Sequence, residues 1–173
     1  DESQFEISVR TPEGTTLEQT ELTATRIGRE VKTLPGVAYT VALVGNDDRQ
    51  TANLASIFVR LTDIHKRTAS QFQIMDGVRT KVLPKFAAEK LRVSVSQVAT
   101  ISGGGMSNKE IAFYVSGPDL QKLGEYSTRL TSALAKVPGV VDVDTSLVLG
   151  KPEMAVNLDR KKAAELGVQV ADV

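Results

Sequence analysis

Apolar and polar residues alternate from Phe5 to Arg10, near the start of the chain. A period of two is typical of a strand with one buried face. An apolar stripe at helical spacing follows from Leu17 to Leu34 and ends at Pro35-Gly36, which cannot continue a helix. Thr15 and Glu18 have the spacing of a capping box, so we expect the helix to begin there.

The next segments complete a unit of six elements. Two strands, Val37 to Val44 and Leu54 to Leu61, flank the turn-forming residues 45–50. Thr68-x-x-Gln71 is a second capping signal, for a helix to about Phe86, and residues 91–95 alternate as a fourth strand. The order βαββαβ predicts an α+β ferredoxin-like fold, with two helices on one face of a four-stranded antiparallel sheet.

The same order begins again after a glycine-rich joint at residues 101–109. Strands are expected at 111–115, 141–148 and 154–158, a helix at 120–137, and another helix from about Asp159. Leu34-Pro-Gly-Val37 returns as Val137-Pro-Gly-Val140, a shift of 137 − 34 = 103 positions. We therefore divide the chain into a first unit (1–102), a joint (103–109) and a second unit (110–173). The closing strand of the second unit is missing, so we expect the natural polypeptide to continue.

Helices on one side of each sheet leave the other face open to a ligand or partner. Alternation places Ser94, Ser96 and Val98 on that open face of the first unit. In the second unit, Asp142 and Asp144 share a face. The apolar helical stripes and the remaining apolar strand positions are expected to form the core.

Composition excludes several classes of function. Lys+Arg and Asp+Glu both number 21, without clustering, so the concentrated positive charge of a nucleic-acid surface is absent. The chain has no cysteine, no apolar run long enough to span a bilayer, and a single histidine, His65, in a polar setting typical of solvated loops. We expect no catalytic residue, no cofactor and no resident metal.

Three further motifs favour structural interpretations. Gly103-Gly-Gly105 lacks the lysine and spacing of a phosphate-binding loop, which favours a linker. Asp142 and Asp144 have no companion base or metal ligand, which makes them a weak catalytic signal. The thioethers of Met75, Met106 and Met154 would suit Cu(I) if folding united them, but gap filling or exposure to solvent is favoured.

Several stretches resemble a known family. They are residues 7–19, the strand end Phe58-Val-Arg-Leu-Thr-Asp63, and above all Leu158-Asp-Arg-Lys-Lys-Ala-Ala-Glu-Leu-Gly-Val168. Essentially the whole chain resembles the periplasmic porter region of resistance-nodulation-division (RND) efflux transporters, of the AcrB hydrophobe/amphiphile exporter type. The first unit is similar to subdomain PC1 and the second to the first part of PC2, before an inserted docking domain.

The resemblance implies a substrate cleft between the two units. The implied substrate-binding residues are Val41, Leu43, Phe58, Ser94, Ser96, Val98 and Asp144. The loop Gly45, Asn46, Asp47, Asp48, Arg49, Gln50 would match the switch loop between the entry and deep pockets. Serines at 94 and 96 replace frequent aromatic residues, Asp144 replaces a basic one, and the loop is short and lacks phenylalanine. A polyaromatic drug specificity therefore does not follow.

The implied function is substrate conduction in a proton-driven exporter of the bacterial inner membrane. This segment would lie in the periplasm, without the transmembrane proton-relay carboxylates. The parent is expected to be a homotrimer with a periplasmic adaptor (membrane fusion protein) and an outer-membrane channel, and to export small molecules. Two alternatives stay open: the porter segment of a heavy-metal RND exporter, and a soluble tandem ferredoxin-like regulatory domain that binds a ligand.

Overall fold

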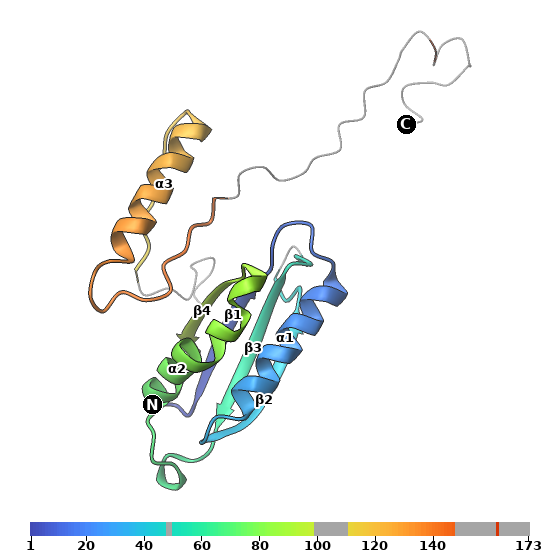
Figure 1. Ribbon diagram of the computed structural model, residues 1–173, viewed down its shortest axis with the longest axis vertical. Helices are drawn as coiled ribbons and strands as arrows, with labels where there is room; N and C mark the ends of the chain where they lie inside the picture. The colour runs from blue at the N-terminus through green and yellow to red at the C-terminus, as the bar shows by residue number, and fades with distance from the viewer. Residues whose placement is uncertain (48–49, 99–110, 148–161, 163–173) are drawn as a thin grey trace.

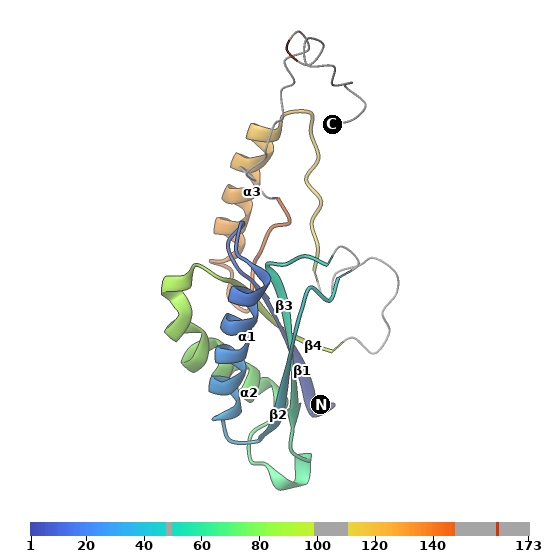
Figure 2. The ribbon, with the colours of Figure 1, turned by 90° about the vertical axis from the view of Figure 1, so that its right-hand side faces the viewer.

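The computed structural model describes residues 1–47, 50–98, 111–147 and 162, and a four-stranded antiparallel sheet forms its first unit (Figure 1). The strands are β1 (Gln4–Arg10), β2 (Val37–Val44), β3 (Leu54–Leu61) and β4 (Arg92–Gln97), in the order β2-β3-β1-β4. Helices α1 (Leu17–Lys32) and α2 (Gln71–Gly77) lie on one face of the sheet, and none of the described helices covers the other face (Figure 2). The predicted ferredoxin-like order is therefore confirmed for this unit.

The alternation of side chains along the strands determines which residues enter the core between the sheet and the helices. Alternate residues of β1 and β3 are fully buried, and their neighbours along each strand are not. The buried stripe of α1 packs on this surface through Ala24, Ile27 and Val31. Met75 lies in the same core, 4% exposed, which confirms the gap-filling interpretation of this methionine.

Helix α1 begins one residue later than its capping signal suggested. Thr16, not Thr15, is the N-cap, and its hydroxyl accepts a hydrogen bond from Gln19 N at 3.3 Å. Thr15 instead donates its hydroxyl to the carbonyl of Pro12 at 2.7 Å. The expected Thr15–Glu18 box is therefore wrong, because two adjacent threonines carry the same local signal.

The second helix is also displaced and changes its winding. Ser70 and Gln73 form the capping box, so the expected start at Thr68 is wrong. After Gly77 the helix widens into a π-helical turn (Val78–Val82) and then tightens into a 3₁₀ segment (Leu83–Glu89). Pro84 lies at the start of that segment and lacks a backbone N–H, so regular α-helical bonding cannot continue through it.

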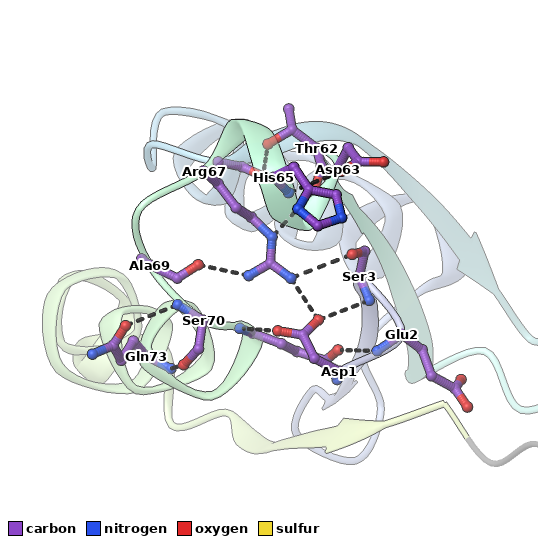
Figure 3. Close-up of polar contacts among 12 residues, drawn as sticks. Asp1, Glu2, Ser3, Thr62, Asp63, His65, Arg67, Ala69, Ser70 and Gln73 are labelled. Carbon is purple, nitrogen blue, oxygen red and sulfur yellow. Dashed lines mark hydrogen bonds and ion pairs between the residues drawn. The ribbon is translucent and has the colours of Figure 1, made fainter.

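A buried arginine ties the start of the chain to α2 (Figure 3). The Arg67 side chain is 2% exposed and pairs with the carboxylate of Asp1 at 2.5 Å. It also donates to the carbonyls of Thr62 at 3.2 Å and Ala69 at 2.6 Å. Asp1 in turn accepts from Gln71 N, the first residue of α2, at 3.0 Å. These bonds compensate the desolvation of the guanidinium.

The second unit supplies a helix but no sheet within the described residues. Helix α3 (Leu120–Leu134) forms where it was expected. Residues 111–117 and 141–147 have no β-ladder, so the strands expected there are wrong for the described positions. A strand needs hydrogen-bonded neighbours, and these segments find none in the described part of the chain. The strand at 154–158 and the helix start at 159 lie outside the described residues.

Candidate functional site: the open face of the sheet

Strand register brings most of the expected site residues into two rows on the helix-free face. In the first row, Val41 lies opposite Phe58, Phe58 opposite Glu6, and Glu6 opposite Ser96. In the second row, Leu43 lies opposite Ser56, Ser56 opposite Ser8, and Ser8 opposite Ser94. Paired residues on one face have Cβ atoms about 5 Å apart. Five of the seven expected residues thus form a single surface, which we call the open face.

The open face has an apolar half and a polar half. Strands β2 and β3 contribute Val41, Leu43 and Phe58, of which Val41 is 44% exposed and Leu43 is 47% exposed. Strands β1 and β4 contribute a carboxylate and three hydroxyls at the paired positions: Glu6, Ser8, Ser94 and Ser96. Four strands about 4.8 Å apart make a surface of small-molecule width. The arrangement is suited to a ligand with one apolar and one polar part.

Three residues of the two rows, Glu6, Ser8 and Ser56, were not among the expected site residues, and Glu6 is the charged one. It occupies the middle of the first row, and it has no hydrogen-bond or ion-pair partner within the part of the chain that the structure describes. Arg60, one row away on β3, donates to Gln4 instead, at 3.0 Å. Alternation with Phe5 and Ile7 already placed Glu6 on this face, so the signal was present in the sequence.

The loop between β2 and β3 borders the open face beside Leu43. Its described residues are held by Asp47, whose carboxylate accepts from the backbone N–H of Thr51 at 2.7 Å and from the Thr51 hydroxyl. Asn53 anchors the loop to the β1–α1 connection, because it donates its amide to the carbonyl of Thr11 at 3.1 Å. Asp48 and Arg49, two of the expected switch-loop residues, lie outside the described residues.

Asp144 lies at the border of the open face, at an arginine of β4. Its carboxylate and Arg92 form an ion pair with an N–O distance of 3.0 Å. The same guanidinium donates to the carbonyl of Thr145 at 2.6 Å. Arg92 lies opposite Arg10 on β1, directly beyond the Ser8–Ser94 pair. Any ligand that uses Asp144 must therefore compete with Arg92.

The remaining sequence candidates lie apart from these rows. Val98 follows β4 and is half-buried, and His65 is exposed in a short 3₁₀ turn (Ile64–Lys66), as expected of a solvated histidine. Met106 and Met154 lie outside the described residues. No group of three potential metal-binding His, Cys, Asp or Glu side chains occurs among residues 1–47, 50–98, 111–147 and 162.

Two shallow hollows lie on the helical side of the sheet. One has a volume of about 240 Å³ and is lined by Arg26, Arg29, Glu30, Lys85 and Phe86. Lys85 there pairs with Glu30, and Arg26 pairs with Glu89. The other is lined by Leu83, Phe86, Ala87, Leu91 and Val93. Neither contains a residue of the two open-face rows.

All residues from 1 to 173 match the model of the AcrB/AcrD/AcrF family. The chain belongs to the AcrB/AcrD/AcrF family. The multidrug resistance protein MdtC of Cronobacter sakazakii is 30% identical over 120 residues, which is 69% of this chain. MdtC of Yersinia enterocolitica is 29% identical over the same length. The chain spans only 12% of the length of these curated relatives. The predicted resemblance to RND transporters is confirmed.

Solved structures agree with this assignment at the level of the fold. Two crystal forms of a heavy metal efflux pump superpose on the AcrB-family chain with TM-scores of 0.81 and 0.80. Both are 24% identical to it and match 99% of its length, which is 18% and 19% of the pump chains. Among the described residues, no helix combines the length and the apolar character that a membrane crossing requires.

Proposed function

We propose that the open face is part of the path along which an RND multidrug exporter conducts amphiphilic small molecules. The observation that carries this proposal is the pair of rows Val41–Phe58–Glu6–Ser96 and Leu43–Ser56–Ser8–Ser94. Large apolar side chains next to one another and open to water are costly unless something covers them. A passing substrate would cover them transiently.

The division of the open face into an apolar and a polar half supports one class of substrate. Val41, Leu43 and Phe58 would contact its apolar body, and each Å² of apolar area removed from water contributes about 25 cal/mol. Glu6 and the serines would contact its polar end, and an unpaired carboxylate favours a cation. We therefore propose cationic amphiphiles of moderate size as substrates. The small and polar Ser94 and Ser96 would provide hydrogen bonds where aromatic stacking is absent.

Family membership supports the rest of the proposal. The parent protein would be a proton-driven transporter of the bacterial inner membrane, with this segment in the periplasm. It would act as a homotrimer together with a periplasmic adaptor and an outer-membrane channel. The segment would act by binding and conformational change, with Asp144 and the loop at 45–50 bordering the substrate path.

A heavy-metal substrate has less support from the described residues. A thioether site would need several methionines to converge, and Met75 is buried in the core of the first unit. Similarity to the heavy metal efflux pump is a similarity of fold at 24% identity. The multidrug resistance protein MdtC of Cronobacter sakazakii has a higher identity, 30%, over a shorter match of 120 residues.

Efflux by the full-length transporter that contains this chain tests the proposal. We expect Val41→Asp to slow ethidium efflux from cells, because a carboxylate would interrupt the apolar half of the open face. Leu22→Asp is the matched control, since Leu22 is 60% exposed on α1, away from the open face. Equal ethidium efflux in both variants would contradict the proposal, and a loss of Ag(I) tolerance without a loss of ethidium efflux would favour the metal alternative.

A further inference from the structure

Within the described residues, β4 is an edge strand of the sheet, and an ion pair instead of a neighbouring strand covers one residue on its outer edge. The N–H of Val95 donates to the Asp142 carboxylate at 2.9 Å, and the carbonyl of Val95 accepts from Arg79 Nη2 at 2.6 Å. Arg79 and Asp142 are themselves paired, at 2.9 Å. Together they present an acceptor and a donor to Val95, as the backbone of a fifth strand would.

The two charged side chains are arranged as one unit. Oδ2 of Asp142 accepts from Arg79 Nε at 3.0 Å, from Arg79 Nη2 at 2.9 Å and from the N–H of Val95. The side chains of Arg79 and Asp142 are 19% and 17% exposed, so solvent weakens their attraction only in part. The remaining nitrogen of Arg79, Nη1, donates to the exposed Asp76 at 3.0 Å.

Backbone geometry at both ends of the ion pair is unusual. Asp142 has φ of +54°, in the left-handed region that non-glycine residues seldom occupy. Arg79 lies in the π-helical turn Val78–Val82, a form of helix that is rare and often found at functional positions. Strained backbone persists only where the surrounding contacts stabilise it. Here those contacts join the two units of the chain.

A second contact determines the direction of the segment that carries Asp142. Asp142 contacts Val95, and Thr145, three positions later, contacts Arg92, three positions earlier on β4. Residues 142–145 therefore run antiparallel to β4. The side chains of Asp142 and Arg92 bridge the two backbones. Asp144 is thereby held at the border of the open face. The hydroxyl of Thr145 also bonds that of Ser127 at 2.8 Å, which connects α3 to the same segment.

We propose that Arg79 and Asp142 are positioning residues that clamp the second unit of the chain onto the edge of β4. The clamp determines how far the segment with Asp144 lies from the open face, and its release lets the two units separate. The consequence for transport rests on the function proposed above. The clamp itself is a property of the chain and can be tested without any substrate.

Spin labels and amide exchange on the 173-residue chain test the clamp. The chain has no cysteine, so labels at Glu21→Cys on α1 and Glu125→Cys on α3, both exposed positions, report the distance between the units. We expect one narrow distance distribution in the otherwise unchanged chain. In Asp142→Ala the distribution should broaden to at least about twice its width, and exchange of the Val95 amide should accelerate by about tenfold or more.

Three further variants separate positioning from a general loss of structure. Asp76→Ala removes the exposed partner of Arg79 and should leave both measurements unchanged. Arg79→Lys keeps the charge but cannot donate to Asp142 and Val95 with two nitrogens of one planar group, so it should broaden the distances as well. Asp142→Asn keeps an acceptor for the Val95 N–H and should give an intermediate result. Amides of the β1–β3 ladder should stay protected in every variant and show that the sheet is folded.

Two results would overturn the clamp. One is an unchanged distance distribution and an unchanged Val95 exchange rate in Asp142→Ala. The other is an equal effect of Asp76→Ala and Asp142→Ala. Neither result would bear on ligand binding by the open face, and a failure of ligand binding would leave the clamp measurements intact.

Discussion

Glu6 and Phe58 lie directly opposite each other on β1 and β3, at the boundary between the polar and the apolar half of the open face. Phe58 continues the row to Val41, and Glu6 continues it to Ser96. A cationic amphiphile lying across the strands would contact both residues at once. The contribution of each contact can be measured separately.

Phe58→Ala should weaken binding of amphiphiles regardless of their charge. Loss of about 50 Å² of apolar contact corresponds to about 1 kcal/mol, or roughly fivefold in affinity. Fluorescence titrations of the chain with ethidium, a monocation, and with the neutral dye N-phenyl-1-naphthylamine measure this effect. Phe72→Ala is the control, because Phe72 is 52% exposed on α2, on the other side of the sheet. Equal losses in the two variants would show that binding is not localised to the open face.

Glu6→Gln should distinguish the two dyes. The substitution keeps the size of the side chain and removes its charge, so the affinity for ethidium should fall about two- to fivefold, the usual range for a partly exposed charge pair. The affinity for the neutral dye should not change. Glu21→Gln on α1 provides the matched loss of one negative charge elsewhere. A similar fall in affinity for both dyes would contradict the proposed role of the Glu6 carboxylate.

Arg67→Ala should destabilise the first unit strongly. The substitution removes the Arg67 donors to the carbonyls of Thr62 and Ala69 and the ion-pair partner of Asp1, which together should cost about 3 kcal/mol of unfolding free energy. Urea denaturation followed by circular dichroism measures this loss. The exposed neighbour Lys66 serves as the control, since Lys66→Ala should change the free energy by less than about 0.5 kcal/mol. Similar unfolding free energies for Arg67→Ala and Lys66→Ala would mean that the bonds of Arg67 contribute little to stability.

The repeated Pro-Gly turn offers a test with two matched positions. Gly36 and Gly139 have φ of +92° and +86°, but a Cβ would meet Ile74 Cδ1 at 3.1 Å only at Gly36, with nothing within 4 Å at Gly139. Alanine at either position should cost about 1 kcal/mol for the backbone conformation. At Gly36 the crowding of Ile74 should add about 1 kcal/mol or more. A larger loss of stability for Gly139→Ala would contradict this comparison.

Local patterns predicted the first unit well because its strands and helices depend on local periodicity. Strands β2 and β3 span the expected residues 37–44 and 54–61, and the buried stripe of α1 follows the predicted one except at Leu17, which is 49% exposed. The helix caps were predicted one and two residues too early, because nearby hydroxyl residues, such as Thr15 and Thr16, satisfy the same rule. Periodicity also predicted α3, but it could not predict the strands of the second unit, since a strand exists only when a neighbour bonds to it.

The sequence predicted which face of the sheet the candidate site residues occupy. It did not predict which of them lie opposite one another. Alternation assigned Ser94 and Ser96 to the open face, whereas their alignment with Ser8 and Glu6 depends on strand register, which no local pattern fixes. The contact between Arg79 and Asp142 could not be predicted either, because it also joins segments that are distant in the sequence. Arg79 and Asp142 are 63 positions apart, and neither has a distinctive sequence neighbourhood.

A titration of the ¹⁵N-labelled chain with ethidium, followed by amide chemical shifts, tests the central claim most directly. We predict saturable shifts at Val41, Leu43, Phe58, Glu6, Ser94 and Ser96, with little change along α1. Saturable shifts confined to the hollow around Arg26 and Phe86, or the absence of any saturable shift, would contradict a substrate path over the open face.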